Sequence, residues 1–456
     1  MGKDTTIGTQ RLADLFDAGT FSEVGALIKR EDGRSCGAVC GAVCGYGAVN
    51  GRLVFAFAQD SDREKGAFDR TVAKKLHALY DAAIRNGAPI IGVFDSIGAY
   101  VTDGADAMAA YGSFLADVSR ASGVVPQLAW IDGVCAGLCA TAAAMFDLTV
   151  TVEGRSELFV GAPFLTGRDG GAETVSASGL SSVSATDRAD AIAKLRTLIG
   201  LLPSSCAALT EQLGSDDANR TCMVSTSSVR ETVGDVCDRG SFIEIGSGFG
   251  KGTVTGLCTL GGYPCGVVAN DPSVSGGVLT ADGARKAAKL ISLCDCFGLP
   301  VLTLVDSEGV AVDAAEESAP LAAELGRLAM VYASASVAKL TAVVGKAYGA
   351  AFTLLGSKAL GADVVYATEN ASVSAMKPDA AVAFLWSDRV TEQTSRASLV
   401  KEWNETEATP VRAAESGAID DVLPAGDLRR YLCAAVNMLL CKDEAALTRK
   451  HCSLPL

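Results

Sequence analysis

Two glycine-containing segments could bind a negatively charged oxygen through the backbone. They are Gly133–Leu138 (GVCAGL) and Gly345–Ala350 (GKAYGA), and each is predicted to be a loop that leads into a helix. The first N–H groups of a helix lack an intrahelical partner, and glycine lets a ligand come close to the backbone. Two such donors from separate loops can form an oxyanion hole for an enolate. For either segment alone, tight helix–strand packing is the structural alternative.

A second donor for each hole could come from a strand end. Asp95–Ala99 (DSIGA) and Asp306–Val310 (DSEGV) both follow directly after short apolar runs. Backbone N–H groups at such ends point outward without a partner in the sheet. Because the pairing of strand end and glycine segment occurs twice, we favour binding over packing.

Histidine-based catalysis is not expected in this chain. Only two histidines are present, His77 inside a helical pattern and His451 near the end of the sequence. Neither occupies a predicted strand-end loop, where a Ser-His-Asp or Cys-His arrangement would need it. Backbone donors therefore remain the main candidates for the chemistry.

The fifteen cysteines do not form a metal-binding pattern. Cys36, Cys40 and Cys44 recur at every fourth position, and Cys294 and Cys296 flank one aspartate, but no CxxC pair faces another. A zinc site would usually need such pairs or added histidines. We therefore expect no metal and reduced, buried thiols that behave as small hydrophobes. The cysteines inside apolar runs are Cys135, Cys139, Cys258, Cys265 and Cys433.

The composition is that of a globular α/β protein. Of 456 residues, 49% are hydrophobic and 20% charged, which argues against disordered and fibrous classes. The net charge of −14 makes nucleic acid an unlikely partner class. Residues 1–10 lack a basic region followed by an apolar stretch, and the longest apolar run, Gly133–Phe146, is shorter than a membrane span. We expect a cytoplasmic protein.

The sequence contains an internal repeat, which predicts a duplicated fold. Gly51–Asp60 corresponds to Gly262–Asp271, and Asp95 corresponds to Asp306, both 211 residues later. The offset is 212 between Gly137 and Gly349 and 215 or 216 further on. We attribute the gain to about one helical turn near residues 356–358.

Each copy is predicted as strand, helix, strand, glycine loop, helix and strand. In the first copy, strands are expected over 53–58 and 90–94, with a helix over 72–84 between them. Apolar strands that alternate with helices indicate a mostly parallel sheet. Residues 179–235 are rich in Ser, Thr and Asp and are interpreted as a linker with one helix over 189–202. We expect domains over 1–225 and 226–456.

These motifs together resemble the carboxyltransferase subunits of biotin-dependent acyl-CoA carboxylases and decarboxylases, of the propionyl-CoA carboxylase beta and methylmalonyl-CoA decarboxylase alpha type. The likeness runs nearly from end to end of the sequence. It rests mainly on Gly45–Gly47, Asp95–Ala99, Tyr111–Gly112, Gly133–Gly137, Phe242–Glu244, Val267–Asn270, Gly277–Leu279, Lys346–Gly349, Gly356–Lys358, Gly361–Asp363 and Ile419–Val422.

The resemblance implies an α/β fold of tandem crotonase-like (ClpP/crotonase) domains that exchanges CO2 between biotin and the α-carbon of an acyl-CoA. Both partners pass through an oxygen anion, so each domain needs one hole. The acyl-CoA side is expected in the N-terminal domain and the biotin side in the C-terminal domain. Carried over by position, the first hole is Gly98, Ala99, Gly137 and Leu138, and the second is Gly309, Val310, Gly349 and Ala350. Substrate contacts are expected from Ala136, Tyr348, Phe352 and Thr353.

The family also implies partners. We expect biotin to arrive on a biotin carboxyl carrier protein, with a biotin carboxylase or a membrane decarboxylase subunit as a further partner. A homohexamer, a trimer of dimers, is expected, in the cytoplasm or at the face of a membrane complex. Ala375-Met376-Lys377 resembles a biotin attachment site but precedes Pro378 inside the predicted core, so we do not expect biotin on this chain.

Departures from the family pattern keep two alternatives open. The family usually has Gly at Ile97, Leu138 and Ala350, Arg at Gly345 and Pro at Glu308. These changes keep the backbone donors but alter the pocket, so a noncatalytic scaffold subunit is one alternative. A crotonase-type hydratase or isomerase is the other, and Glu308 is its only candidate base.

Overall fold

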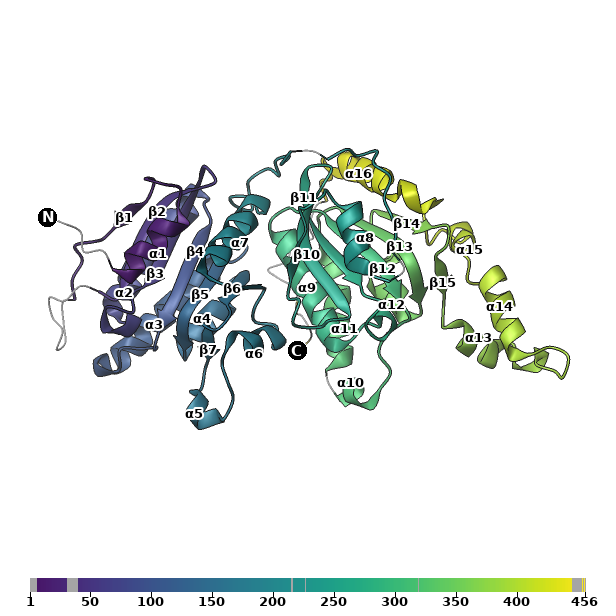
Figure 1. The fold of residues 1–456 in the computed structure, drawn as a ribbon, viewed down its shortest axis with the longest axis horizontal. Helices are drawn as coiled ribbons and strands as arrows, with labels where there is room; N and C mark the ends of the chain where they lie inside the picture. The colour runs from purple at the N-terminus through teal and green to yellow at the C-terminus, as the bar shows by residue number, and fades with distance from the viewer. Residues whose placement is uncertain are drawn as a thin grey trace. The chain divides into compact units, whose positions relative to one another are not determined.

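The computed structural model describes residues 6–30, 40–214, 216–225, 227–318, 320–444, 453 and 455, and two compact units divide the chain at 209/210. Each unit contains one eight-stranded mixed sheet with its own helices (Figure 1). Cys36 and His451 lie outside the described residues.

The first sheet has the order β1-β2-β3-β4-β5-β6-β8, with β7 paired to the far end of β5. The β1, β2 and β3 strands are antiparallel, and every later pairing is parallel. The strands are β1 (Ser22–Val24), β2 (Ala42–Val49), β3 (Arg52–Gln59), β4 (Ile90–Ser96), β5 (Gln127–Ala136), β6 (Leu148–Val152), β7 (Glu157–Phe159) and β8 (Val183–Ala185).

The second sheet repeats this plan with the order β9-β10-β11-β12-β13-β14-β16, and β15 pairs with the far end of β13. Only its β9, β10 and β11 strands pair in antiparallel fashion. The strands are β9 (Ile243–Ile245), β10 (Thr253–Leu260), β11 (Tyr263–Asn270), β12 (Val301–Ser307), β13 (Lys339–Tyr348), β14 (Val364–Thr368), β15 (Ser372–Ser374) and β16 (Asp421–Leu423).

Two long helices connect the central strands in each unit, α2 and α3 in the first and α9 and α11 in the second. The start of α2 is capped by Asp69, whose side chain accepts from the Val72 N–H, and α2 ends at Gly87 in a left-handed conformation. The helices are α1 (Ile7–Leu15), α2 (Arg70–Asn86), α3 (Ala105–Ala121), α4 (Leu138–Ala144), α5 (Pro163–Thr166), α6 (Ala172–Ala177), α7 (Arg188–Leu201), α8 (Val229–Val236), α9 (Ala281–Cys296), α10 (Ala314–Ser318), α11 (Leu321–Ser334), α12 (Ala350–Leu354), α13 (Pro378–Leu385), α14 (Arg396–Thr406), α15 (Pro410–Glu415) and α16 (Leu428–Leu439).

A separate apolar core stabilises each unit. In the first, aromatic side chains from β3, β4, α2 and α3 pack together, including Phe57, Phe94 and Phe114 at ring-centroid distances of 5.5 and 5.8 Å. In the second, aliphatic and cysteine side chains from β10–β13, α8 and α16 form the equivalent cluster. The thiols predicted to be buried hydrophobes are 0–2% exposed.

The structure differs from two expectations about local elements. Residues 133–136 and 345–348 are not loops but the last residues of β5 and β13. Residues 179–235 contain the expected helix, α7, but also β8, which pairs with β6 inside the first sheet. A strand of three residues carries too little periodicity to be recognised in a polar segment.

Candidate functional site

The structure brings each predicted strand end beside its predicted helix start. The end of β4 pairs with the end of β5 through Ser96 and Cys135, and the end of β12 pairs with the end of β13 through Ser307 and Ala347. Both pairings contain a register shift just before these residues, which opens the two strand ends. Each unit therefore places a strand-end loop against the start of a short helix.

Four of the predicted residues around the first site have distinct roles in the backbone. The Gly98 N–H donates to the Ser96 Oγ at 3.1 Å, and the Gly137 N–H donates to the last carbonyl of β7 at 2.9 Å. These two groups are therefore occupied. The Ala99 and Leu138 N–H groups donate to no other residue that the structure describes. They are the two donors that remain for a ligand.

The second site repeats this arrangement. The Gly309 N–H donates to the Ser307 Oγ at 3.2 Å, and the Gly349 N–H donates to the last carbonyl of β15 at 2.9 Å. Within the described part of the chain, Val310 and Ala350 have N–H groups without an acceptor. Each unit thus presents one donor from a strand end and one from the first residue of a helix.

The glycines shape the backbone around these donors. Gly137 and Gly349 have φ of +63° and +58°, and Gly98 and Gly309 have φ of +108° and +130°, values that strain other residues. A Cβ on Gly98 would lie 3.5 Å from the carbonyl oxygen of Ala136. A side chain would therefore fit at this position, and it is the positive φ that favours glycine there.

One aspartate in each unit holds the end of the central strand in place. The Asp95 Oδ1 accepts from the Val134 N–H at 3.3 Å, and the Asp306 Oδ1 accepts from the Lys346 N–H at 2.9 Å. A Cβ at position 345 would lie 2.3 Å from the Asp306 Cγ, so glycine is required there for this packing. Burial raises the pKa of Asp306.

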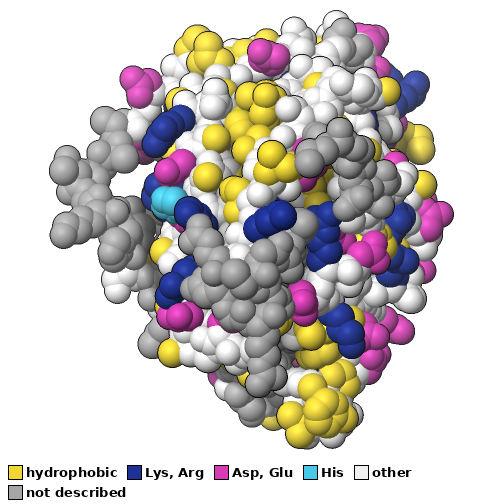
Figure 2. All heavy atoms as spheres, turned by 90° about the vertical axis from the view of Figure 1, so that its left-hand side faces the viewer, with side chains coloured by type: hydrophobic (Ala, Val, Ile, Leu, Met, Phe, Trp, Pro, Cys, Tyr) yellow, Lys and Arg dark blue, Asp and Glu magenta, His cyan; other side chains and the backbone are white. Residues whose placement is uncertain are grey.

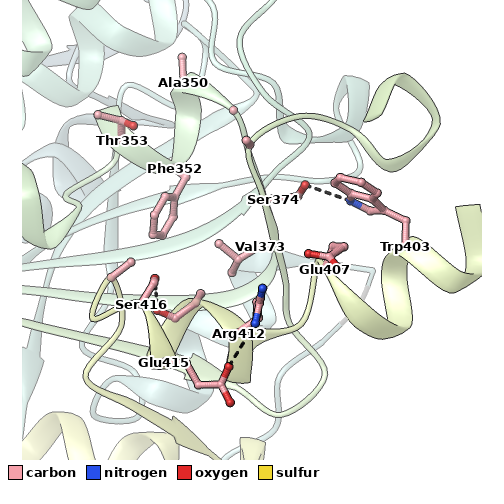
Figure 3. Close-up of a pocket in the computed structure, with 14 residues that line it drawn as sticks. Ala350, Phe352, Thr353, Val373, Ser374, Trp403, Glu407, Arg412, Glu415 and Ser416 are labelled. Atoms are coloured by element: carbon pink, nitrogen blue, oxygen red, sulfur yellow. Dashed lines mark hydrogen bonds and ion pairs between the residues drawn. The ribbon is translucent and has the colours of Figure 1, made fainter. Parts of the chain in front are cut away.

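A cavity of about 800 Å³ opens beside the second hole (Figure 3). Gly349, Ala350, Phe352 and Thr353 line one wall, and Figure 3 shows the opposite side formed by side chains from α14 and α15. Five further lining residues were not predicted, because no local sequence pattern links these helices to β15. They are Trp403, Glu407, Arg412, Glu415 and Ser416.

One hydrogen bond and one exposed ion pair lie in the wall of this cavity. The Trp403 Nε1 donates to the Ser374 Oγ at 3.3 Å, and Arg412 pairs with Glu415 at 3.8 Å (Figure 3). Tyr348, predicted to contact substrate, donates its hydroxyl to the Ser372 Oγ at 3.0 Å and is 7% exposed. Its side chain supports β15.

Glu308, the candidate base of a hydratase, is paired with two lysines. Its Oε1 lies 2.7 Å from the Lys346 Nζ, and its Oε2 lies 2.5 Å from the Lys377 Nζ. These lysines lower the pKa of Glu308. Lys377, one of these two lysines, directly precedes α13 and does not lie at the tip of a hairpin.

The remaining chemistry-bearing groups lie elsewhere. His77 lies on α2, where its Nδ1 is 2.9 Å from Asp117 on α3.

Among the described residues, no group of three or more His, Cys, Asp or Glu side chains is placed to hold a metal ion. No helix in the same part of the chain is long and apolar enough to cross a membrane. On the face of the first unit in Figure 2, basic and acidic side chains are interspersed.

A family model described as carboxyl transferase domain matches residues 1–454. The chain belongs to the carboxyl transferase family. This confirms the resemblance, and with it membership among the acyl-CoA carboxyltransferase subunits.

Two relatives align with this chain over most of the length of both proteins. The chain is 33% identical to the propionyl-CoA carboxylase carboxyltransferase subunit of Haloferax mediterranei, over 90% of this chain and 85% of that one. It is 32% identical to the methylmalonyl-CoA decarboxylase subunit alpha of Propionigenium modestum, over 98% and 92%.

The solved structure of the transcarboxylase 12S component, a hexamer with methylmalonyl-coenzyme A and methylmalonic acid bound, matches with a TM-score of 0.93 at 29% identity. The match covers 98% of this chain and 92% of that one. The tandem crotonase-like fold is therefore confirmed.

Proposed function

We propose that this protein transfers CO2 between biotin on a partner carrier protein and the α-carbon of a short acyl-CoA, with the propionyl-CoA and methylmalonyl-CoA class as substrates. The observation that carries the proposal is the pair of unoccupied backbone donors in each unit, Ala99 with Leu138 and Val310 with Ala350. Two holes suit a transfer in which both the donor and the acceptor of CO2 carry charge on oxygen.

The first hole serves the thioester in this proposal. When the α-carbon gains or loses its carboxyl group, the thioester carbonyl becomes an enolate oxygen. The Ala99 and Leu138 N–H groups donate to that oxygen and lower the energy of the enolate. These donors are fixed by β4 and by the start of α4, so they need no reorganisation as the charge develops.

The second hole serves biotin, which is a substrate of this chain rather than a resident group. Biotin supplies a ureido nitrogen that carries CO2. Val310 and Ala350 donate to the ureido oxygen, and the adjoining cavity of about 800 Å³ has the volume for a small ring system. Phe352 and Thr353 would contact that ring.

Two features disfavour a hydratase or isomerase. Such an enzyme needs a carboxylate that takes and returns a proton near the first, acyl-CoA hole. Glu308 instead lies in the second unit, and its two lysine partners lower its pKa, which weakens it as a base.

The proposed partners follow from the relatives. Biotin would arrive on a carrier protein, with a biotin carboxylase or a membrane decarboxylase subunit completing the complex, and six copies of this chain would form the core. The transcarboxylase 12S structure, a hexamer, supports this assembly.

The test uses the purified, assembled oligomer with malonyl-CoA, methylmalonyl-CoA or glutaconyl-CoA, each with and without biotin or a biotinylated carrier. We expect biotin-dependent loss of the carboxyl group from methylmalonyl-CoA, followed by mass spectrometry. Hydration or isomerisation of an enoyl-CoA without biotin would support the hydratase. An assembled oligomer that converts none of these thioesters would support the scaffold.

A further inference from the structure

The surroundings of the two holes differ in charge at equivalent positions. The strand pairings that carry the holes match in the two units, as do the prolines that begin α5 and α13. Three positions beside each hole can therefore be compared directly. The residues at these positions are uncharged in the first unit and charged in the second. The pairs are Ile97 and Glu308, Val134 and Lys346, and Ala162 and Lys377.

The three charged side chains form one bridge. Each Glu308 oxygen contacts one ammonium group, Oε1 with Lys346 at 2.7 Å and Oε2 with Lys377 at 2.5 Å. The lysine side chains are 48% and 49% exposed, whereas Glu308 is 28% exposed. The bridge has one net positive charge, and its more accessible parts are the cations. We name it the Lys346–Glu308–Lys377 bridge.

The backbone beside Glu308 leaves room for its side chain. The Glu308 N–H donates to the Gly276 carbonyl at 3.0 Å, as the Ile97 N–H donates to the Lys65 carbonyl at 3.3 Å in the first unit. A Cβ on Gly276 would lie only 2.8 Å from the Glu308 Cδ. Gly276, which stands where the first unit has Lys65, thus leaves space for the glutamate side chain in this conformation.

The bridge also lies at the second hole. Glu308 is two residues before the donor Val310, and Lys377 is two residues after Ala375. The Ala375 carbonyl oxygen would be 3.4 Å from a Cβ on Gly349, the residue before the other donor. Its three members therefore flank the loops that carry both donors of this hole.

We propose that Lys346 and Lys377, held in place by Glu308, form a cationic subsite that binds the carboxylate carried on N1 of biotin. The inference rests on the proposed function and specifies how the second site recognises its CO2-bearing ligand. An ammonium group has three N–H donors, so each lysine keeps donors for a second anion after pairing with Glu308. The three equivalent positions beside the first hole, Ile97, Val134 and Ala162, carry no charge.

The test measures equilibrium binding rather than turnover. The probes are an amide of biotin with a carboxymethyl group on N1, which is a stable anion, and its neutral methyl ester. Isothermal titration calorimetry on the assembled oligomer compares their dissociation constants. We expect the anion to bind about fivefold to tenfold more tightly than the ester, with a preference that decreases as salt is added.

Variants assign this preference to the two lysines. Lys346→Met and Lys377→Met should each bring the ratio of the two dissociation constants close to one. Lys377→Arg should keep the ratio of the unaltered protein, because the cation is kept. Lys251→Met, a change at an exposed lysine in the turn before β10, should leave the ratio unchanged.

Equal binding of anion and ester by the unaltered protein would overturn the subsite, and so would an unchanged preference in both methionine variants. The thioester assay reports separately on the proposed function. Carboxyl transfer without an anion preference would reject the subsite alone, and an anion preference without transfer would reject the function alone.

Discussion

At the scale of single residues, the proposed donors of both holes do not depend on side-chain identity. Leu138 and Ala350 are the expected departures from glycine, yet each is the first residue of its helix and keeps an N–H group without an intrahelical partner. The helix start leaves this group unpaired whatever side chain follows. The departures therefore change the volume beside the ligand and not the donors.

Proline at position 138 should remove one donor and little else. Proline is tolerated at the first position of a helix, and only its N–H is lost. We expect Leu138→Pro to lower kcat for carboxyl transfer by about 100-fold to 1,000-fold, the usual cost of one oxyanion donor. The same change at Ala350 should act similarly at the second hole. Steady-state kinetics with methylmalonyl-CoA and biotin measure both.

Ala105→Pro is the matched control. Ala105 is exposed and is the first residue of α3, after Gly104 at φ 58° and ψ −128°, and Leu138 follows Gly137 at φ 63° and ψ −129°. This control should retain full activity and an unchanged melting temperature. If Leu138→Pro matched it in kcat, the Leu138 N–H would not be a donor to the reacting oxygen.

At the scale of elements, one buried lysine ties the long helix of the second unit to its sheet. The Lys286 Nζ on α9 donates to the carbonyls of Phe249 and Thr253 at 2.9 and 2.7 Å, just before and at the start of β10. Lys75 on α2 makes the equivalent bond to the Ala42 carbonyl. Burial lowers the pKa of Lys286 to about 8 from its ordinary value of 10.5.

This lowered pKa predicts a pH-dependent stability. Below pH 8 both the folded and unfolded chains bind the proton, so the folded chain bears the full cost of a buried charge. Between pH 8 and 10.5 the folded chain has released that proton and the unfolded chain has not, so stability rises with pH.

We expect the free energy of unfolding of the unaltered protein, relative to Lys286→Met, to increase by about 3 kcal/mol over this range. Urea unfolding at a series of pH values provides the measurement, and the variant cancels the titration of all other groups. Parallel curves for the two proteins would contradict the burial of the ammonium group.

The sequence was sufficient for elements whose signal lies in a few adjacent residues. The repeat and the apolar runs located β3, β4 and α2 within two residues, and the structure places each predicted strand end beside its predicted glycine segment. Contacts between distant segments were not predictable. Trp403 and Arg412 reach the cavity from α14 and α15, and Lys377 meets Glu308 across 69 positions of sequence, without a local pattern that marks either contact.

At the scale of the whole molecule, exposed apolar side chains occur on corresponding helices of the two units, α5 and α13. Phe164 and Leu165 on α5 are 86% and 76% exposed, and Phe384 and Leu385 on α13 are 77% and 53% exposed. Large apolar groups in water are characteristic of surfaces that another protein covers. In the proposed hexamer, a second copy of the chain would cover them.

Light scattering should give a mass of about 280 kDa for the unaltered protein, six copies of 46.6 kDa. Phe164→Asp or Phe384→Asp should produce smaller species, because a buried unpaired carboxylate is costly at an interface. Circular dichroism shows whether each variant still folds. A folded hexamer in both variants would place the interface elsewhere.

The separation of the two sheets has a consequence for how the protein is made. Every strand of the first sheet lies before residue 186, and every strand of the second lies after residue 242. No strand of the first sheet has to wait for a partner from the later half. While the ribosome is still translating the second half, the first can already close its sheet, so the topology allows two successive folding events during synthesis.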